Sequence, residues 1–275
     1  MLRRLLIGIA FAALVAACAT SPTGRQQLML VSEEQAISAS RQAYVQEMGK
    51  YKKEGKLVTD PRVLNRVAVI TGRLVAQAIA MRPDSAKWEW SVQVIDEPKT
   101  VNAWCMAGGR MAIYTGLIQQ VDPTDAELAQ VMGHEIAHAL ANHTAEQMSM
   151  AMAGQAGVIA AGILSDKPAQ AMVMAAAAAK LAVELPNSRA AENEADEIGI
   201  KLAAKAGYDP RAAVTLWQKM AKVGGGKAPP AFLSTHPSDA QRLQRLGGMV
   251  PRMMPLYQQP GTRPTHPVRI GAAAV

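Results

Sequence analysis

The stretch that decides the fold is Val131-Met132-Gly133-His134-Glu135-Ile136-Ala137-His138-Ala139-Leu140, which places two histidines and a carboxylate among apolar residues. At about 100° per residue, His134 and His138 lie one helical turn apart on the same face, so both imidazoles can reach one ion. Glu135 points about 100° away from them, beside the ion rather than onto it. Burying these three polar groups without partners would be costly. The stretch therefore predicts a buried helix that binds a metal.

The spacing is that of the HExxH motif, in which two neutral imidazoles bind Zn²⁺ and the glutamate accepts a proton from water at the metal. The sequence predicts one zinc ion per chain, with His134 and His138 as ligands and Glu135 as the catalytic base. A random chain of this length would contain the motif in roughly one case in a hundred, so a third ligand is needed as support.

The third ligand is expected downstream. The pattern HExxHxxGxxH would require Gly at 141 and His at 144, where the chain has Ala141 and Thr144. The remaining pattern takes a glutamate from a later helix, and the segment 188–205 offers one. Its apolar stripe consists of Ala191, Ala195, Ile198 and Leu202.

Two carboxylates, Glu192 and Asp196, flank this stripe one turn apart. Glu192 is the predicted third ligand, and Asp196 is predicted to orient an imidazole from behind. Glu194 and Glu197 lie on the opposite face and are predicted to be solvated. The alternative is that Glu192 and Asp196 merely decorate a surface helix.

The chain has 275 residues and is 49% hydrophobic, which suits one substantial globular domain, and only 4% of its residues are aromatic. Helix signals dominate, with a short run of strand patterns between them. The expected elements are a helix from Ser32 to about Gly49, a helix capped by Asp60-Pro61 that ends near Arg82, strands at 88–95, 101–106 and 110–114, and the motif helix capped by Thr124 and Glu127. From there to about Gly248 the sequence indicates helix and turn. The fold class is therefore α+β, predominantly α.

Residues 1–17 are predicted to be a signal peptide, with a positive start at Arg3 and Arg4, an apolar run and a small-residue cleavage region. The sequence Val15-Ala16-Ala17-Cys18 resembles the bacterial lipobox, which makes Cys18 the expected lipid anchor and 18–31 a lipidated tether. By the sorting pattern of Gram-negative bacteria, Ala19 after the cysteine implies an outer-membrane lipoprotein that faces the periplasm. The alternative is a plain signal peptide with an incidental cysteine.

The peptidase domain is expected to span 32–250 and to contain an apolar helical hairpin at 147–185, because 148–164 carry no charge and 169–183 are rich in alanine. Packing against protein is favoured over insertion into a membrane. From Pro251 onward, four further prolines predict an extended tail at 251–275 with no assigned function.

Net charge argues against nucleic acid as a partner. The formal charge of +7 falls to +5 once Arg3 and Arg4 are removed, and the sequence has no dense run of Lys and Arg with interleaved aromatic residues.

With the HEIAH sequence, the Glu192-x-x-x-Asp196 pair and the lipobox in hand, the chain resembles metallopeptidase family 48. This group of gluzincin zinc endopeptidases includes the CAAX prenyl proteases and HtpX-like proteases. Further segments carry the resemblance: 23–34, Val101-Asn102-Ala103-Trp104 with Gly108-Gly109, 206–210, and Thr235-His236-Pro237-Ser238. Cys105-Met106-Ala107 departs from the family pattern before the two glycines.

The resemblance implies a zincin-like domain whose small edge sheet, at Asn102, Ala103 and Trp104, holds an extended substrate peptide. It also implies a role in protein quality control. The expected substrates are unfolded or misassembled envelope proteins, and the outer-membrane assembly machinery is a candidate partner. The resemblance also places His236 near the metal. There the imidazole would either stabilise the transition state or fill the open ligand position of a resting form. The third alternative is that His236 caps a helix and takes no part in the chemistry. The alternative function is a chaperone-like, substrate-binding lipoprotein with a latent or structural zinc site.

Overall fold

The computed structural model describes residues 18–164, 188–223, 231–236 and 240–271, so the predicted signal peptide lies outside the described residues. The chain forms two compact units. The first unit comprises Met1–Ala36 and Asn142–Leu185, and the second comprises Ile37–Ala141 and Pro186–Val275.

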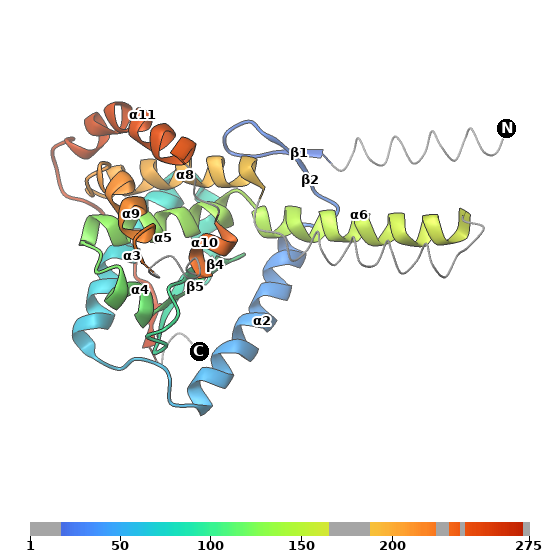
Figure 1. Cartoon of the computed structure of the whole chain (residues 1–275), viewed down its shortest axis with the longest axis horizontal. Coiled ribbons are helices and arrows are strands. Elements are labelled where there is room, and N and C mark those ends of the chain that lie inside the picture. Colours follow the sequence, from blue (N-terminus) through green and yellow to red (C-terminus); the bar gives the residue numbers. More distant parts are fainter. Residues whose placement is uncertain (1–17, 165–187, 224–230, 237–239, 272–275) are drawn as a thin grey trace. The chain divides into compact units, whose positions relative to one another are not determined.

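The second unit contains most of the helices and the larger sheet (Figure 1). α2 (Glu33–Lys53) begins in the first unit and continues into the second. The other elements of the second unit are, in chain order, α3 (Pro61–Met81), the 3-10 helix η1 (Pro83–Lys87), β3 (Ser91–Ile95), β4 (Ala103–Met106), β5 (Arg110–Tyr114), α4 (Thr115–Gln120), α5 (Asp125–Leu140), α8 (Arg189–Lys205), α9 (Ala212–Met220), α10 (Ala231–Thr235), α11 (Ala240–Tyr257) and β6 (Arg269–Ile270).

The start of α5 is fixed by a reciprocal pair of hydrogen bonds. The Thr124 hydroxyl accepts a hydrogen bond from the Glu127 backbone N–H at 3.2 Å, and the Glu127 carboxylate accepts one from the Thr124 N–H at 2.8 Å. At α3, the Asp60 carboxylate accepts from the Arg62 N–H at 2.9 Å, with Pro61 at the first helical position. Both predicted helix starts are confirmed, because each cap satisfies backbone donors that the helix leaves unpaired.

The larger sheet has the strand order β4-β5-β3-β6. β4 pairs with β5 in antiparallel fashion, whereas β3 is parallel to both β5 and β6. β4 therefore forms an edge of the sheet. The predominantly helical α+β fold predicted from the sequence is confirmed.

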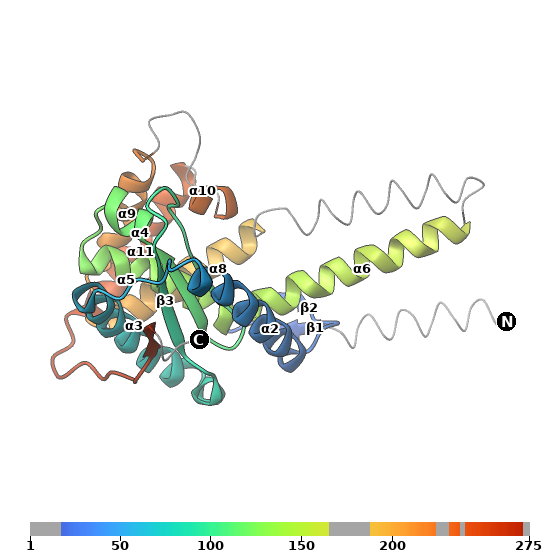
Figure 2. The same cartoon turned by 90° about the horizontal axis from the view of Figure 1, so that it is seen from below.

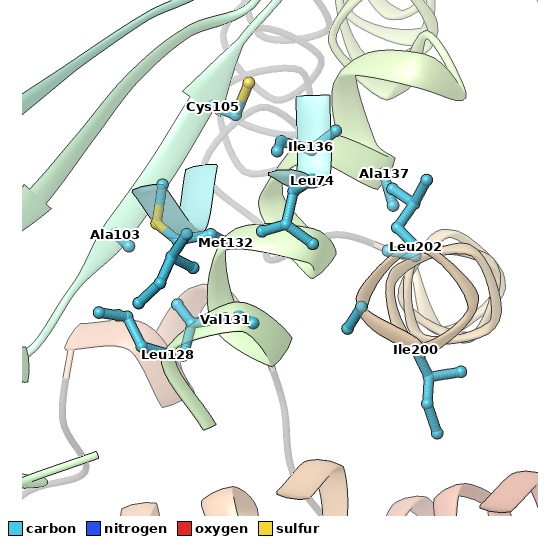
Figure 3. Packing of buried hydrophobic residues seen from close by; sticks show 14 of the residues in the cluster. Leu74, Ala103, Cys105, Leu128, Val131, Met132, Ile136, Ala137, Ile200 and Leu202 are labelled. Atoms are coloured by element: carbon cyan, nitrogen blue, oxygen red, sulfur yellow. The ribbon is translucent and has the colours of Figure 1, made fainter. Parts of the chain in front are cut away.

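α5 lies in the middle of the core. Its side chains from Glu127 to Leu140 are all buried, and it packs on α3, α8, α9 and β4. Figure 3 shows apolar side chains of α5 between those of β4, α3 and α8. α3 is long and apolar enough to cross a membrane by composition alone, yet Val67, Ile70 and Leu74 are buried in this core.

The opposite face of the sheet is covered by α2 (Figure 2). Tyr44 and Met48 of this helix pack against Ile95, Ala112 and Tyr114 of the strands. The sheet thus separates two layers, because its side chains alternate between the α5 face and the α2 face.

The prediction of an extended segment from Pro251 onward is wrong for its first seven residues. α11 continues to Tyr257 and contains Pro251 and Pro255. Each proline costs a helix about 3 kcal/mol, but α11 buries an apolar stripe that includes Leu246, Met249 and Met253 against the core. Further along, the tail joins the sheet as β6, where Ser91 pairs with Arg269.

The first unit contains β1 (Cys18–Thr20), β2 (Gln26–Leu28) and α6 (His143–Leu164). β1 and β2 pair in antiparallel fashion, and both Arg25 guanidinium ends donate hydrogen bonds to Glu146 of α6 at 2.7 and 2.6 Å. α6 covers the residues that were expected to form the first limb of a hairpin. The turn at 166–168 and the second limb lie outside the described residues.

Candidate metal centre

Three elements of the second unit bring four potential metal ligands together. α5 supplies His134 and His138, α8 supplies Glu192, and His236 follows directly after α10. One ligand atom from each of these residues lies within 4.8 Å of those from the others, and all four side chains are buried. The structure thus assembles the residues that the sequence predicted as ligands, together with the histidine whose role was left open.

A close contact between two glycines sets the distance between α5 and α8. A Cβ atom built on Gly199 would lie 2.8 Å from the backbone N of His134, and one on Gly133 would lie 3.0 Å from the Gly199 carbonyl oxygen. Only residues without a side chain allow the two backbones to approach this closely. The glycine pair therefore brings Glu192 within reach of the histidines one helix away.

The donor atoms suit zinc. The Nε2 atoms of His134 and His138 lie 3.1 Å apart, and each is 3.4 Å from an oxygen of Glu192. Two imidazoles and one carboxylate form a ligand set that zinc takes in catalytic sites. Within the described part of the chain, the buried Glu135 Oε1 and Glu192 Oε2 accept no hydrogen bond, which agrees with a site built to hold further partners.

Electrostatics keeps the ligand carboxylate charged. Burial alone would raise the pKa of Glu192, but the charge of His134 and the hydrogen bonds from the surrounding histidines lower it well below its usual range. The pKa of Asp196 is also lowered against the effect of burial, by its contacts with His134 and Arg242. Glu135 differs, because burial raises its pKa and neighbouring charges only partly offset this. A raised pKa means that Glu135 binds a proton more readily than an exposed carboxylate does.

Asp196 contacts the far nitrogen of a histidine. Its Oδ1 lies 3.1 Å from His134 Nδ1, on the opposite side of the ring from Glu192. A carboxylate in this position can fix the orientation of the imidazole.

Sequence reasoning missed Arg242, which is 1% exposed. Its guanidinium donates to Asp196 at 2.9 and 2.6 Å, lies 3.1 Å from Glu192 Oε2, and stacks 3.7 Å from the centre of the Trp217 ring. Arg242 thus places a positive charge beside two buried carboxylates of α8, Glu192 and Asp196, while its flat face is covered by an aromatic side chain.

The sequence does contain a signal for this arginine. Arg242 shares helical spacing with Leu246, Met249 and Met253, the buried stripe of α11. A charged residue on an apolar stripe needs a buried partner of opposite charge.

His236 lies inside the ligand cluster. Its Nδ1 is 2.9 Å from Glu192 Oε1 and 3.2 Å from His134 Nε2, and its Nε2 is 3.4 Å from Glu135 Oε1. The Phe232 ring lies 4.5 Å from the imidazole, and the Phe232 N–H donates to the Val101 carbonyl at 3.0 Å. α10 is therefore tied to the segment that leads into β4. Pro237 and Ser238 lie outside the described residues.

The predicted substrate-binding residues lie at the edge of the sheet. Ala103 and Trp104 belong to β4, and Asn102 directly precedes it, with its side-chain oxygen accepting a hydrogen bond from the Ala103 N–H at 3.0 Å. Ala103 and Cys105 face α5 and share its core. Burial and the nearby charge of Glu135 raise the pKa of the Cys105 thiol well above its usual range.

One expectation for α8 is wrong. Glu194 was predicted on a solvated face, but its side chain is 4% exposed. α8 packs against α5, α11 and α3, so it is covered on more than the single stripe that its sequence indicates.

The model of peptidase family M48 matches residues 61–250, which include the whole centre. The chain is 31% identical to the human mitochondrial metalloendopeptidase OMA1 over 247 residues, covering 86% of this chain and 46% of the relative. It is 40% identical to the Arabidopsis thaliana mitochondrial metalloendopeptidase OMA1 over 159 residues, covering 57% and 31%. The beta-barrel assembly-enhancing protease of Escherichia coli is 27% identical over 211 residues, covering 74% and 42%. The chain spans about half the length, or less, of these relatives.

Proposed function

Because this chain belongs to peptidase family M48, we propose that it is a zinc metalloendopeptidase that hydrolyses peptide bonds in protein substrates. The observation that carries the proposal is the convergence of His134, His138 and Glu192 beside Glu135 in one buried cluster. The same residue types in that arrangement perform metal-assisted hydrolysis in zinc peptidases.

His134, His138 and Glu192 would hold the ion. When bound, zinc supplies Lewis acidity, which polarises a carbonyl and lowers the pKa of water towards about 7. Asp196 keeps the His134 ring oriented, and Arg242 offsets the negative charge that Glu192 and Asp196 place in the core.

Glu135 moves the proton. Its carboxylate lies beside the ligand cluster, 3.4 Å from His236 Nε2, where it can take a proton from the attacking water. The same group then returns that proton to the amine that leaves as the peptide bond breaks.

β4 would hold the substrate. An extended peptide that adds to this edge strand gains backbone hydrogen bonds without much selection of sequence. This suits a protease that acts on unfolded chains.

His236 is proposed to act as a cap in a resting form. Its Nδ1 lies 2.9 Å from Glu192 Oε1 and 3.2 Å from His134 Nε2, two of the atoms that would hold the ion, so its imidazole can serve as a fourth ligand. If so, His236→Ala should raise basal hydrolysis. A loss of about 10²-fold with zinc still bound would instead indicate stabilisation of the transition state.

The proposed setting is quality control of envelope proteins by a lipid-anchored enzyme. The lipobox-like sequence at 15–18 and the similarity to an Escherichia coli protease named for enhancing β-barrel assembly support it. Cys18→Ala should release the protein from membranes, because a lipid chain on that residue is the proposed anchor. Retention of the variant in membranes after a high-salt wash would contradict the anchor.

Zinc content and hydrolysis of an unfolded protein test the activity together. Wild-type protein should bind one zinc per chain and lose hydrolysis when a chelator removes it, and Glu192→Ala should lose both. The alternative, a chaperone-like lipoprotein, predicts that unfolded protein is bound and kept from aggregating but is never cleaved.

A further inference from the structure

A pocket opens between α2 and the edge strand β4, on the face of the sheet that points away from α5. Its volume is about 410 Å³, and its lining includes Ala43 and Glu47 from the helix and Trp104, Met106 and Tyr114 from the strands. We infer that this pocket binds a large apolar side chain of an extended substrate peptide that lies along β4. The inference rests on the proposed function and names a substrate feature that this function would select.

The register of β4 shows which backbone groups a peptide would meet. The Asn102 carbonyl accepts a hydrogen bond from the Tyr114 N–H at 3.1 Å, so these two residues form a hydrogen-bonded pair of the ladder. Trp104 and Ala112, two residues further along each strand, are opposite each other in the same way. In an antiparallel ladder the intervening residues turn their backbone groups outward. The carbonyl of Ala103 and both backbone groups of Cys105 therefore point to the edge where, among the described residues, no further strand pairs.

A strand bound at that edge would present alternate side chains to opposite faces. Those level with Ala103 and Cys105 would face α5 and the metal centre, because both residues belong to the α5 core. Those level with Trp104 and Met106 would face α2, where the pocket lies. One peptide could thus be cleaved on one face while a neighbouring side chain occupies the pocket on the other.

The chemistry of the pocket favours an uncharged, apolar side chain. Trp104 packs edge-on against the buried Tyr44 ring at 5.9 Å, and its indole N–H donates to the Tyr114 hydroxyl at 3.4 Å, so the polar atoms of the aromatic wall are already engaged. At the rim, Lys50 and Glu47 form an ion pair of 3.1 Å, which leaves no net charge to attract a charged residue. The volume falls within the range of pockets that bind small molecules and therefore accommodates a side chain such as leucine or phenylalanine.

The test measures binding apart from cleavage. Fluorescein-labelled extended peptides of serine and threonine carry one phenylalanine at successive positions, and their dissociation constants are measured by anisotropy with the full chain carrying Glu135→Gln. Only the peptide positions whose side chains face α2 can place phenylalanine in the pocket. Phenylalanine at one such position should tighten binding roughly 10- to 100-fold over alanine, the effect of burying one large apolar side chain.

Two tryptophan substitutions on α2 separate the pocket from a general surface effect. Ala43 lines the pocket, whereas Val45 is 54% exposed on the same helix and does not. Ala43→Trp should fill the pocket and abolish the gain from phenylalanine, and Val45→Trp should leave it unchanged. Identical binding profiles for the two variants would overturn the inference.

Cleavage by the chain without these substitutions is scored separately. If peptides are bound with a preference that depends on Ala43 but are never cleaved, the pocket stands and the protease proposal fails. If peptides are cleaved and the preference is absent, the protease proposal stands and the inference about the pocket fails.

Discussion

The metal centre between α5 and α8 and the pocket between α2 and β4 lie on opposite faces of one sheet and differ in the chemistry and burial of their side chains. The centre consists of charged and polar groups that are almost fully buried, such as Glu135 and Glu192 at 3% exposed. The pocket has an aromatic wall, and its charged residues, Glu47 and Lys50, pair with each other at the rim.

The difference shows how tightly each region is constrained. A buried charge is stable only while each of its partners stays in place, so the centre depends on exact neighbours such as Arg242 and the two glycines. An open apolar surface binds through area and shape, and it tolerates change with smaller losses. Substitutions should therefore have larger effects in the centre than in the pocket.

The largest effect is expected for Glu135→Gln. The amide cannot accept a proton, so hydrolysis should fall by about 10²- to 10⁴-fold, while zinc content and melting temperature stay close to those of the wild type. Peptide cleavage assays and metal analysis on the same preparation measure this. Near-normal turnover would remove Glu135 from the mechanism.

Arg242→Ala should have the next largest effect, on stability. It leaves Asp196 and Glu192 without their buried cation, which should lower the free energy of unfolding by about 3–5 kcal/mol. Arg245 is the matched control, since its side chain is 34% exposed and 3.5 Å from Asp196; Arg245→Ala should cost about 1 kcal/mol or less. Denaturant titration compares the two. Equal losses would mean that burial of the arginine is not what matters.

Gly199→Ala should cost less, about 1–3 kcal/mol, because the added Cβ must push α8 away from the His134 backbone. The shift should also weaken zinc binding by separating Glu192 from the histidines. Gly247→Ala on α11 is the control, since nothing lies within 4 Å of its Cβ and alanine favours a helix. A Gly199→Ala variant with wild-type zinc affinity would argue against the close approach of the helices.

The smallest effect concerns Glu127, a buried carboxylate at the start of α5 that has no part in the chemistry. Burial would raise its pKa, but Lys219, Thr215 and the Thr124 N–H lower it below its usual value. A carboxyl with a lowered folded-state pKa adds stability above its unfolded pKa of about 4.5 and loses it as pH falls through the folded value. Glu127→Gln should cost about 1 kcal/mol at pH 7 and flatten the loss of stability in acid. An unchanged acid profile in urea titrations would show that the pair with Lys219 does not contribute.

The sequence determined the parts of this protein that depend on local geometry. His134 and His138 share a helix face at any position in a fold, and the caps at Thr124 and Asp60 depend on residues within a few positions. The periodicity of α8 placed Glu192 and Asp196 beside the stripe of Ala191 and Ala195, but it also assigned Glu194 to a solvated face, and Glu194 is buried.

Only the tertiary structure decided the features that depend on distant partners. Arg242 contacts Asp196, which lies 46 positions earlier in the sequence. Arg269 pairs with Ser91 of β3, although the prolines of the tail predicted only an extended segment. Pro251 and Pro255 are held in a helix because α11 buries Leu246 and Met249 against the core. Covalent geometry fixes how side chains are spaced along a helix or a strand. Which distant residues become neighbours depends on which apolar surfaces are buried against each other, and the packing of the whole unit decides this.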